Sequence, residues 1–160
     1  MRSYIVSACA MVVVMTLAAC SSNKTSLAAY YDFETTCIGT EYDGSLTLRA
    51  WGEGNSKQDA LEQAMKRAVR DVIFRGITQG TSGENMRPLI FEANAEQTYQ
   101  DYFNRFFADG GEYSNYVNMK DEKSNSKQVF ENAQVYKYGV TVRVLRSELR
   151  QKLQADGIIK

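Results

Sequence analysis

The side chains that could carry chemistry in this sequence are mainly carboxylates, because the 160-residue chain contains no histidine. The absence of histidine excludes a Ser-His or Cys-His pair, a histidine general base and the histidine ligands of most zinc sites. Two carboxyl groups ~5–10 Å apart in a cleft could instead hydrolyse a glycan. Their spacing in the sequence places no two of them on one surface, so we predict no catalytic residue. The candidates are Glu53, Glu92, Asp101, Asp109 and Glu112.

A strand and a long helix at residues 45–77 are the elements around which the fold is expected to form. Leu46, Leu48 and Ala50 alternate with polar or aromatic residues, which predicts a strand with one apolar face. We expect Gly52 and Gly54 to form a tight turn into the helix. A phosphate-binding turn is the alternative, but a third glycine is missing and Glu53 would repel a phosphate.

The helix is predicted over residues 56–75, with Ser56 as N-cap, Asp59 in the first turn and Gly76 as the stop. Apolar residues recur every four positions in two rows. The row of small residues should lie closest to the sheet. The rows are Ala60, Ala64, Ala68, Val72 and Leu61, Met65, Val69, Ile73. The opposite face is predicted to be solvated and carries Lys57, Glu62, Lys66, Arg67, Arg70 and Asp71.

A hairpin should precede this unit, because Asp43 and Gly44 stand between the strand-like residues 36–42 and the central strand. A two-residue turn with positive φ at both positions is the expected connection. The following loop, residues 78–87, is rich in Gly, Ser and Asn, and Pro88 opens a short apolar run.

A second helix carries a stripe of aromatic residues and is predicted to start at Asn94 and to end at Gly110 and Gly111. The stripe either packs into the core or forms a face that binds a protein partner or a glycan strand. It consists of Tyr99, Tyr102, Phe103, Phe106 and Phe107.

The C-terminal part is predicted to contain a strand at 113–119, a loop at 120–128, a central strand at 136–144 and a helix at 147–157. Leu149 and Leu153 give that helix one apolar face. The whole order predicts an α+β fold. We expect an antiparallel sheet, made of the N-terminal hairpin and the C-terminal strands, with helices packed on one face.

Residues 1–19 have the pattern of a signal peptide: Arg2, an apolar run and small residues before Cys20. The run is shorter than the ~20 residues of a transmembrane helix. Leu17-Ala18-Ala19-Cys20 resembles the lipobox of bacterial lipoproteins. That resemblance implies that Cys20 becomes the first mature residue and carries fatty acyl chains such as palmitate. An ordinary signal cut that leaves Cys20 unmodified is the alternative.

The lipid would anchor the protein, and the polar residues 20–30 would form a tether to a single domain over residues 31–160. Ser21 and Ser22, in place of an aspartate, imply transport to the outer membrane, with the periplasmic or surface face left open. Cys9 would leave with the leader, so no disulfide is predicted. Cys37, without a histidine to activate it, is predicted to be a small buried residue rather than a nucleophile.

Charge gives no sign of a nucleic-acid partner, because 19 basic residues balance 19 acidic ones. Hydrophobic residues make up 44% of the chain, which is enough for one domain with a core.

The segment Arg49-Ala50-Trp51-Gly52-Glu53-Gly54, followed by the alanine row, resembles the domain of LPP20-type lipoproteins and related flagellar-accessory domains. The chain is also similar to lipoproteins of the Bacteroidetes. These resemblances imply a small non-catalytic α/β domain at the periplasm or the cell surface.

Together these features predict a membrane-anchored envelope lipoprotein that acts as a binding or assembly module for an envelope complex. We expect it to need no cofactor and no metal, to contact the membrane through its lipid, and to bind an envelope protein. The oligomeric state stays open. The alternative function is a carboxylate-based hydrolase that acts on envelope glycans.

Overall fold

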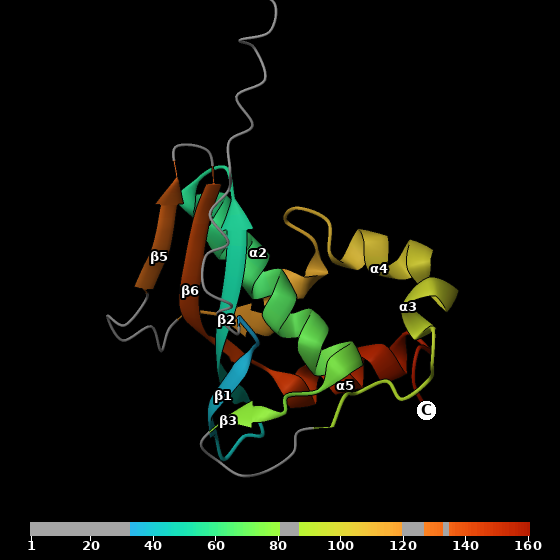
Figure 1. The fold of residues 1–160 in the computed structure, drawn as a ribbon. Helices are drawn as coiled ribbons and strands as arrows, with labels where there is room; N and C mark the ends of the chain where they lie inside the picture. The colour runs from blue at the N-terminus through green and yellow to red at the C-terminus, as the bar shows by residue number, and fades with distance from the viewer. Residues whose placement is uncertain (1–32, 81–86, 120–126, 133–134) are drawn as a thin grey trace, which may run out of the picture. The chain divides into compact units, whose positions relative to one another are not determined.

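The computed structural model describes residues 33–80, 87–119, 127–132 and 135–160, which form an α+β fold (Figure 1). Contacts group Phe33–Lys160 into one unit. The predicted leader, the tether and Cys20 lie outside the described residues. No helix among the described residues is long and apolar enough to span a membrane. The elements are β1 Thr36–Thr40, β2 Leu46–Gly54, α2 Lys57–Arg70, η2 Asp71–Arg75, β3 Gln79–Gly80, α3 Ala95–Thr98, α4 Gln100–Phe106, η3 Glu112–Tyr116, β4 Val117–Asn118, β5 Lys127–Asn132, β6 Val135–Val144 and α5 Arg146–Ala155.

The sheet has six strands among the described residues, in the order β3-β1-β2-β6-β4, with β5 also paired to β6. β6 is central, as the sequence predicted. It pairs antiparallel with the whole of β2, and its other edge is divided between β4 and β5. The expectation of a purely antiparallel sheet was wrong, because β3 pairs parallel with β1. Strand β2 and helix α2 with its continuation η2 lie between β1 and β3 in the chain, and a connection of that length allows the two strands to run in the same direction.

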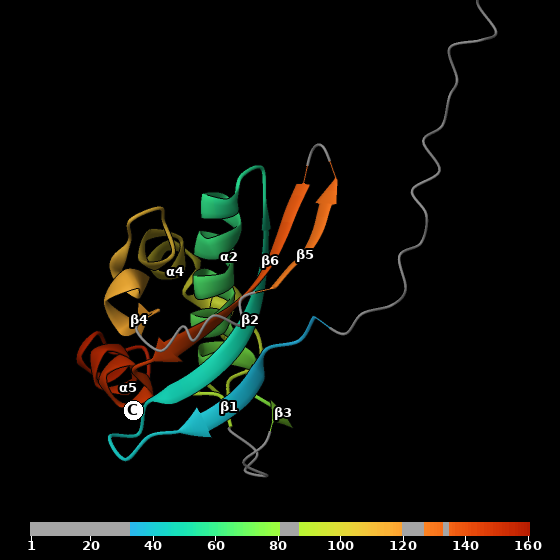
Figure 2. The ribbon, with the colours of Figure 1, turned by 90° about the vertical axis from the view of Figure 1, so that its left-hand side faces the viewer.

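Helix α2 packs directly on the sheet, and the helices lie on one side of it (Figure 2). Ala60, Ala64 and Ala68 are completely buried, as predicted for the row nearest the sheet. Leu48 and Val142, paired across β2 and β6, are equally buried. The small alanine side chains therefore let the helix backbone approach the strands closely.

The predicted turn at Gly52 and Gly54 was wrong, and so was the phosphate-binding alternative that depended on it. Both glycines belong to β2 and pair with Tyr138 and Tyr136 of β6. A Cβ on Gly52 would overlap the backbone of Ala60 and Ala64 in α2. The glycines are therefore required by the close approach of the helix, and not by turn geometry.

Helix α2 begins as predicted, because the Ser56 hydroxyl accepts a 3.1 Å hydrogen bond from the Asp59 amide. It continues into the π-helix η2, where the Gly76 amide donates to the Asp71 carbonyl at 2.7 Å, and Gly76 has φ +75°. The Val72 and Ile73 carbonyls accept from the amides of residues 89 and 90. Residues 89 and 90 thus bond to carbonyl groups that the wider turn of the π-helix makes accessible.

The predicted hairpin β1–β2 is confirmed, but its turn differs from the expected one. Of the two central residues, only Gly44 has positive φ, at +79°. The Asp43 carboxylate accepts hydrogen bonds from the Ser45 amide at 2.8 Å and the Ser45 hydroxyl at 2.6 Å. These bonds lower the pKa of Asp43 and hold a longer turn closed by a 2.9 Å bond from the Glu41 amide to the Ser45 carbonyl.

In the C-terminal part, the strand at 136–144 and the final helix are confirmed. Leu149 and Leu153 of α5 are completely buried, and Gly157 follows with φ +72°. The strand predicted at 113–119 is mostly the 3₁₀-helix η3, with only the two-residue β4 at its end. Residues 120–126 of the predicted loop lie outside the described part, and its last two residues open β5.

Candidate functional site

Two residues of the aromatic stripe lie in the core, and the other three pack against it. Phe103 and Phe106 are 3% and 2% exposed, whereas Tyr99, Tyr102 and Phe107 are partly buried against the same core. The Phe103 ring meets Phe74 of η2 edge to face, with ring centroids 4.7 Å apart. Only the three partly buried rings could therefore contribute to the partner-binding face considered from the sequence.

The helix that carries the stripe is shorter than predicted and divides at Tyr99 into α3 and α4. Asn94 does not cap it with its side chain; it adopts φ +64°, and its carbonyl accepts from the Gln97 and Thr98 amides. Asparagine tolerates this left-handed conformation, so backbone geometry replaces the side-chain cap that the sequence suggested.

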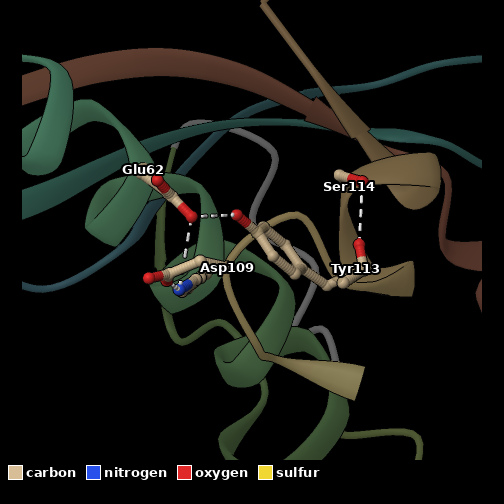
Figure 3. Close-up of polar contacts among 6 residues, drawn as sticks. Glu62, Asp109, Tyr113 and Ser114 are labelled. Atoms are coloured by element: carbon tan, nitrogen blue, oxygen red, sulfur yellow. Dashed lines mark hydrogen bonds and ion pairs between the residues drawn. The ribbon is translucent and has the colours of Figure 1, made fainter. Parts of the chain in front are cut away.

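A lysine between two carboxylates joins the α4–η3 segment to α2. The side chains of Glu62, Asp109 and Tyr113 meet at this point (Figure 3). Lys66 Nζ lies 3.3 Å from Glu62 and 2.5 Å from Asp109, and the Tyr113 hydroxyl donates to Glu62 at 3.0 Å. Burial alone would lower the pKa of Lys66, but its bonds to Asp109 and Glu62 outweigh this effect and raise it. The bond from Lys66 lowers the pKa of Asp109.

A second cluster, again a lysine between two carboxylates with a tyrosine hydroxyl, joins the α4–η3 segment to α5. Lys152 Nζ lies 2.8 Å from Glu112 and 3.2 Å from Asp156, and the Tyr102 hydroxyl donates to Asp156 at 2.6 Å. The bond from Tyr102 lowers the pKa of Asp156. The two clusters fix the aromatic segment from both sides, and we interpret them as structural.

We predict that Tyr113→Phe costs about 1 kcal/mol of stability at neutral pH, because the hydrogen bond to Glu62 is lost. Burial, the bond to Glu62 and the nearby acidic charges raise the pKa of Tyr113. A raised pKa stabilises the fold below the unfolded value of about 10, and that contribution is lost as the pH rises above it. Urea unfolding between pH 8 and 11 should therefore show a steeper alkaline decline for the wild type than for Tyr113→Phe.

Tyr42→Phe is the matched control for this experiment, because the Tyr42 side chain is fully exposed. Its stability should follow the wild-type curve at every pH. Parallel curves for the wild type and Tyr113→Phe would contradict the role of Tyr113.

The structure spreads the candidate carboxylates over separate elements. Glu53 is the next-to-last residue of β2 and pairs with Lys137. Asp109 follows α4 and pairs with Lys66, and Glu112 in η3 pairs with Lys152. Glu92 and Asp101 are exposed, before α3 and in α4. Of the five, only Glu53 lines the groove described next.

A groove of about 1200 Å³ lies between the end of β2, the hydrophilic face of α2 and the α3–α4 segment. The α2 face contributes most of its positive charge, and α3 and α4 contribute most of its amides. Phe103 and Phe107 also line it. The lining residues are Trp51, Gly52, Glu53, Gln63, Lys66, Arg67, Arg70, Asp71, Arg75, Glu96, Gln97, Gln100, Phe103, Asn104 and Phe107.

Most charged side chains that line the groove form an ion pair with a side chain of opposite charge. Arg70 Nη2 lies 2.5 Å from Glu96, and Arg75 Nη1 lies 3.9 Å from Asp71. Asp71 is buried and also accepts the Thr35 hydroxyl at 2.5 Å. Arg67 differs: its Nη1 donates to the Trp51 carbonyl at 3.3 Å, and it pairs with no carboxylate among the described residues.

Sequence reasoning missed this groove, because it treated the charged face of α2 as simply solvated. A signal was present. Gln63, Arg67 and Arg70 follow one another at helical spacing, as do Gln97, Gln100 and Asn104. That spacing does not show that this face of α2 lies opposite α3 and α4.

The chain matches no family model, no curated protein and no solved structure. The resemblance to LPP20-type lipoproteins therefore stays a prediction. Among the described residues, no group of three or more His, Cys, Asp or Glu side chains could hold a metal ion. Cys37 is 2% exposed, so the prediction that it is buried is confirmed.

Proposed function

We propose that this protein is a lipid-anchored envelope lipoprotein of the outer membrane whose domain binds a protein partner and catalyses no reaction. The observation that supports the proposal best is the groove, with its amides, guanidinium groups and partly exposed Phe107. Side-chain amides both donate and accept hydrogen bonds, and arginine is enriched at binding interfaces. The lipobox at Cys20 and the similarity to LPP20-type lipoproteins support the location.

The alternative is a carboxylate-based glycan hydrolase, and one observation keeps it in view. Glu53, Asp71 and Glu96 line the same groove. Each of them pairs with a cation, respectively Lys137, Arg75 and Arg70. A glycosidase needs two carboxyl groups free to act on the scissile bond, whereas these three are held by cations. Turnover of envelope glycans by the purified protein, abolished by Glu53→Gln or Glu96→Gln, would replace the binding proposal.

We predict that a photo-crosslinking amino acid at Gln100, which lines the groove, captures one envelope protein in cells that express the lipoprotein. The same amino acid at Gln151, which is exposed on α5 and outside the groove, is the matched control and should capture none. Mass spectrometry of the adducts checks both results. Equal capture at the two positions, or capture at neither, would contradict binding in the groove.

A further inference from the structure

Arg67 differs from the other cations that line the groove, because it has no carboxylate partner among the described residues. Lys66, Arg70 and Arg75 each form an ion pair with a carboxylate. The Arg67 side chain is exposed, and its Nη1 donates to the neutral Trp51 carbonyl at 3.3 Å. A guanidinium group has five N–H donors in a fork that fits a carboxylate. One bond to a carbonyl therefore leaves most of the Arg67 donors available to a ligand.

Arg70 stands beside Arg67 and is held by an ion pair that a ligand could replace. The two arginines are three residues apart on α2, so they share one face of the helix. Arg70 Nη2 lies 2.5 Å from Glu96 of α3, and the side chains are 55% and 43% exposed. An ion pair this exposed contributes little to stability. A carboxylate from outside could thus take the place of Glu96 at Arg70.

We propose that the groove binds an acidic segment of the partner protein, with one carboxylate on Arg67 and a second on Arg70 in place of Glu96. This deepens the binding function proposed above and rests on it. The charges of the groove give the argument: two neighbouring guanidinium groups, one without a carboxylate and one with an exposed partner, complement an acidic sequence.

Side-chain amides on the other wall of the groove favour a peptide as the ligand. Gln97 of α3 and Gln100 and Asn104 of α4 line the groove and are exposed. An amide side chain both donates and accepts hydrogen bonds, so these residues can pair with the N–H and C=O groups of a peptide backbone.

A nucleic acid fits the groove less well, because its closely spaced phosphates need an excess of positive charge. Glu53, Asp71 and Glu96 instead bring three carboxylates to the same lining.

A glycan strand also fits less well, because sugar rings pack on open aromatic faces. Of the aromatic residues that line the groove, Phe103 is 3% exposed. The rings of Trp51 and Phe107 are partly buried and meet neighbouring rings edge to face.

The test begins with a library of random dodecapeptides, selected on the purified full-length lipoprotein in detergent micelles. The selected peptides should contain at least two Asp or Glu residues. Their affinity for the lipoprotein should fall as the salt concentration rises, because salt screens exposed charges.

Three variants then test the two arginine contacts with the best peptide. Arg67→Glu should weaken binding by about tenfold or more. Glu96→Gln should strengthen it severalfold, because this change frees Arg70 and removes a charge that repels the peptide. Arg150→Glu, on the exposed face of α5 outside the groove, is the matched control and should bind as the wild type does.

A charge exchange identifies the contact with Arg67. Each acidic residue of the peptide is replaced by lysine in turn, and every new peptide is measured against the wild type and Arg67→Glu. One of them should bind the wild type more weakly than the original peptide but bind Arg67→Glu more tightly. This recovery would also show that Arg67→Glu is folded.

Several results would overturn the proposal: selected peptides without acidic residues, no selected peptide at all, equal binding by the wild type and Arg67→Glu, or weaker binding by Glu96→Gln. Displacement of the peptide by peptidoglycan fragments would overturn it in favour of a glycan. The crosslink at Gln100 judges the groove-binding function separately, because it does not depend on the charge of the partner.

Discussion

Gly52→Ala is expected to destabilise the domain by more than about 3 kcal/mol, a severe case of overpacking. The new Cβ would overlap the carbonyl oxygen of Ala60 and the backbone nitrogen of Ala64. Backbone atoms cannot rotate away as a flexible side chain can, so either α2 or β2 must move. Because α2 covers both β2 and β6, such a shift would loosen the core at its centre.

Thermal unfolding followed by circular dichroism checks this prediction, with an expected fall in melting temperature of roughly 10 °C or more. Gly39→Ala is the matched control. Gly39 also lies in the hairpin sheet, but no atom lies within 4 Å of the position its Cβ would take, and its φ is not positive. A melting temperature equally lowered in both variants would mean that the close approach of α2 does not explain Gly52.

Cys20→Ala is expected to move the protein almost entirely from the membrane fraction to the soluble fraction. Each buried CH₂ group of an acyl chain contributes about 0.8 kcal/mol, and two chains suffice for stable attachment. Cell fractionation with an antibody against the folded domain measures the effect, and mass spectrometry of the wild-type N-terminal peptide reports the lipid. A wild-type protein that is soluble, or whose Cys20 is unmodified, would contradict the lipobox prediction.

Cys37→Ala is the matched control for this experiment, since it makes the same chemical change at the other cysteine outside the leader. Cys37 is buried in β1, so this variant should lose some stability but should remain in the membrane fraction. The two results together separate anchoring by Cys20 from any general effect of losing a thiol.

Parts of the fold were predictable because they depend on residues close together in the chain. Strand β6 follows from the alternation of its apolar residues, and α2 follows from two rows of apolar residues with Ser56 and Gly76 at its ends. The burial of the alanine row and of Leu149 and Leu153 also follows from this periodicity. Periodicity records which face of an element is apolar, and that face must be buried whatever covers it.

Other predictions failed where two structures are locally compatible with the same residues. Glycines 52 and 54 have the composition of a turn, yet they lie in β2, because α2 is packed too closely to admit a side chain. Asp43 and Gly44 have the composition of a two-residue turn, but the bonds from the Asp43 carboxylate to Ser45 select a longer one. In both cases a contact with a residue outside the turn-like motif decides the conformation.

The sequence by itself determined the class of fold, the central strand, the main helix and the chemistry that is excluded by the absence of histidine. Only the tertiary structure decided that β3 runs parallel to β1 and that Phe103 and Phe106 of the aromatic stripe belong to the core. It also decided that Trp51, Arg67 and Gln100 line one groove. Local patterns specify which face of a helix or strand is apolar. The distance between residues far apart in the chain depends on how the elements pack, and no spacing in the sequence records that packing.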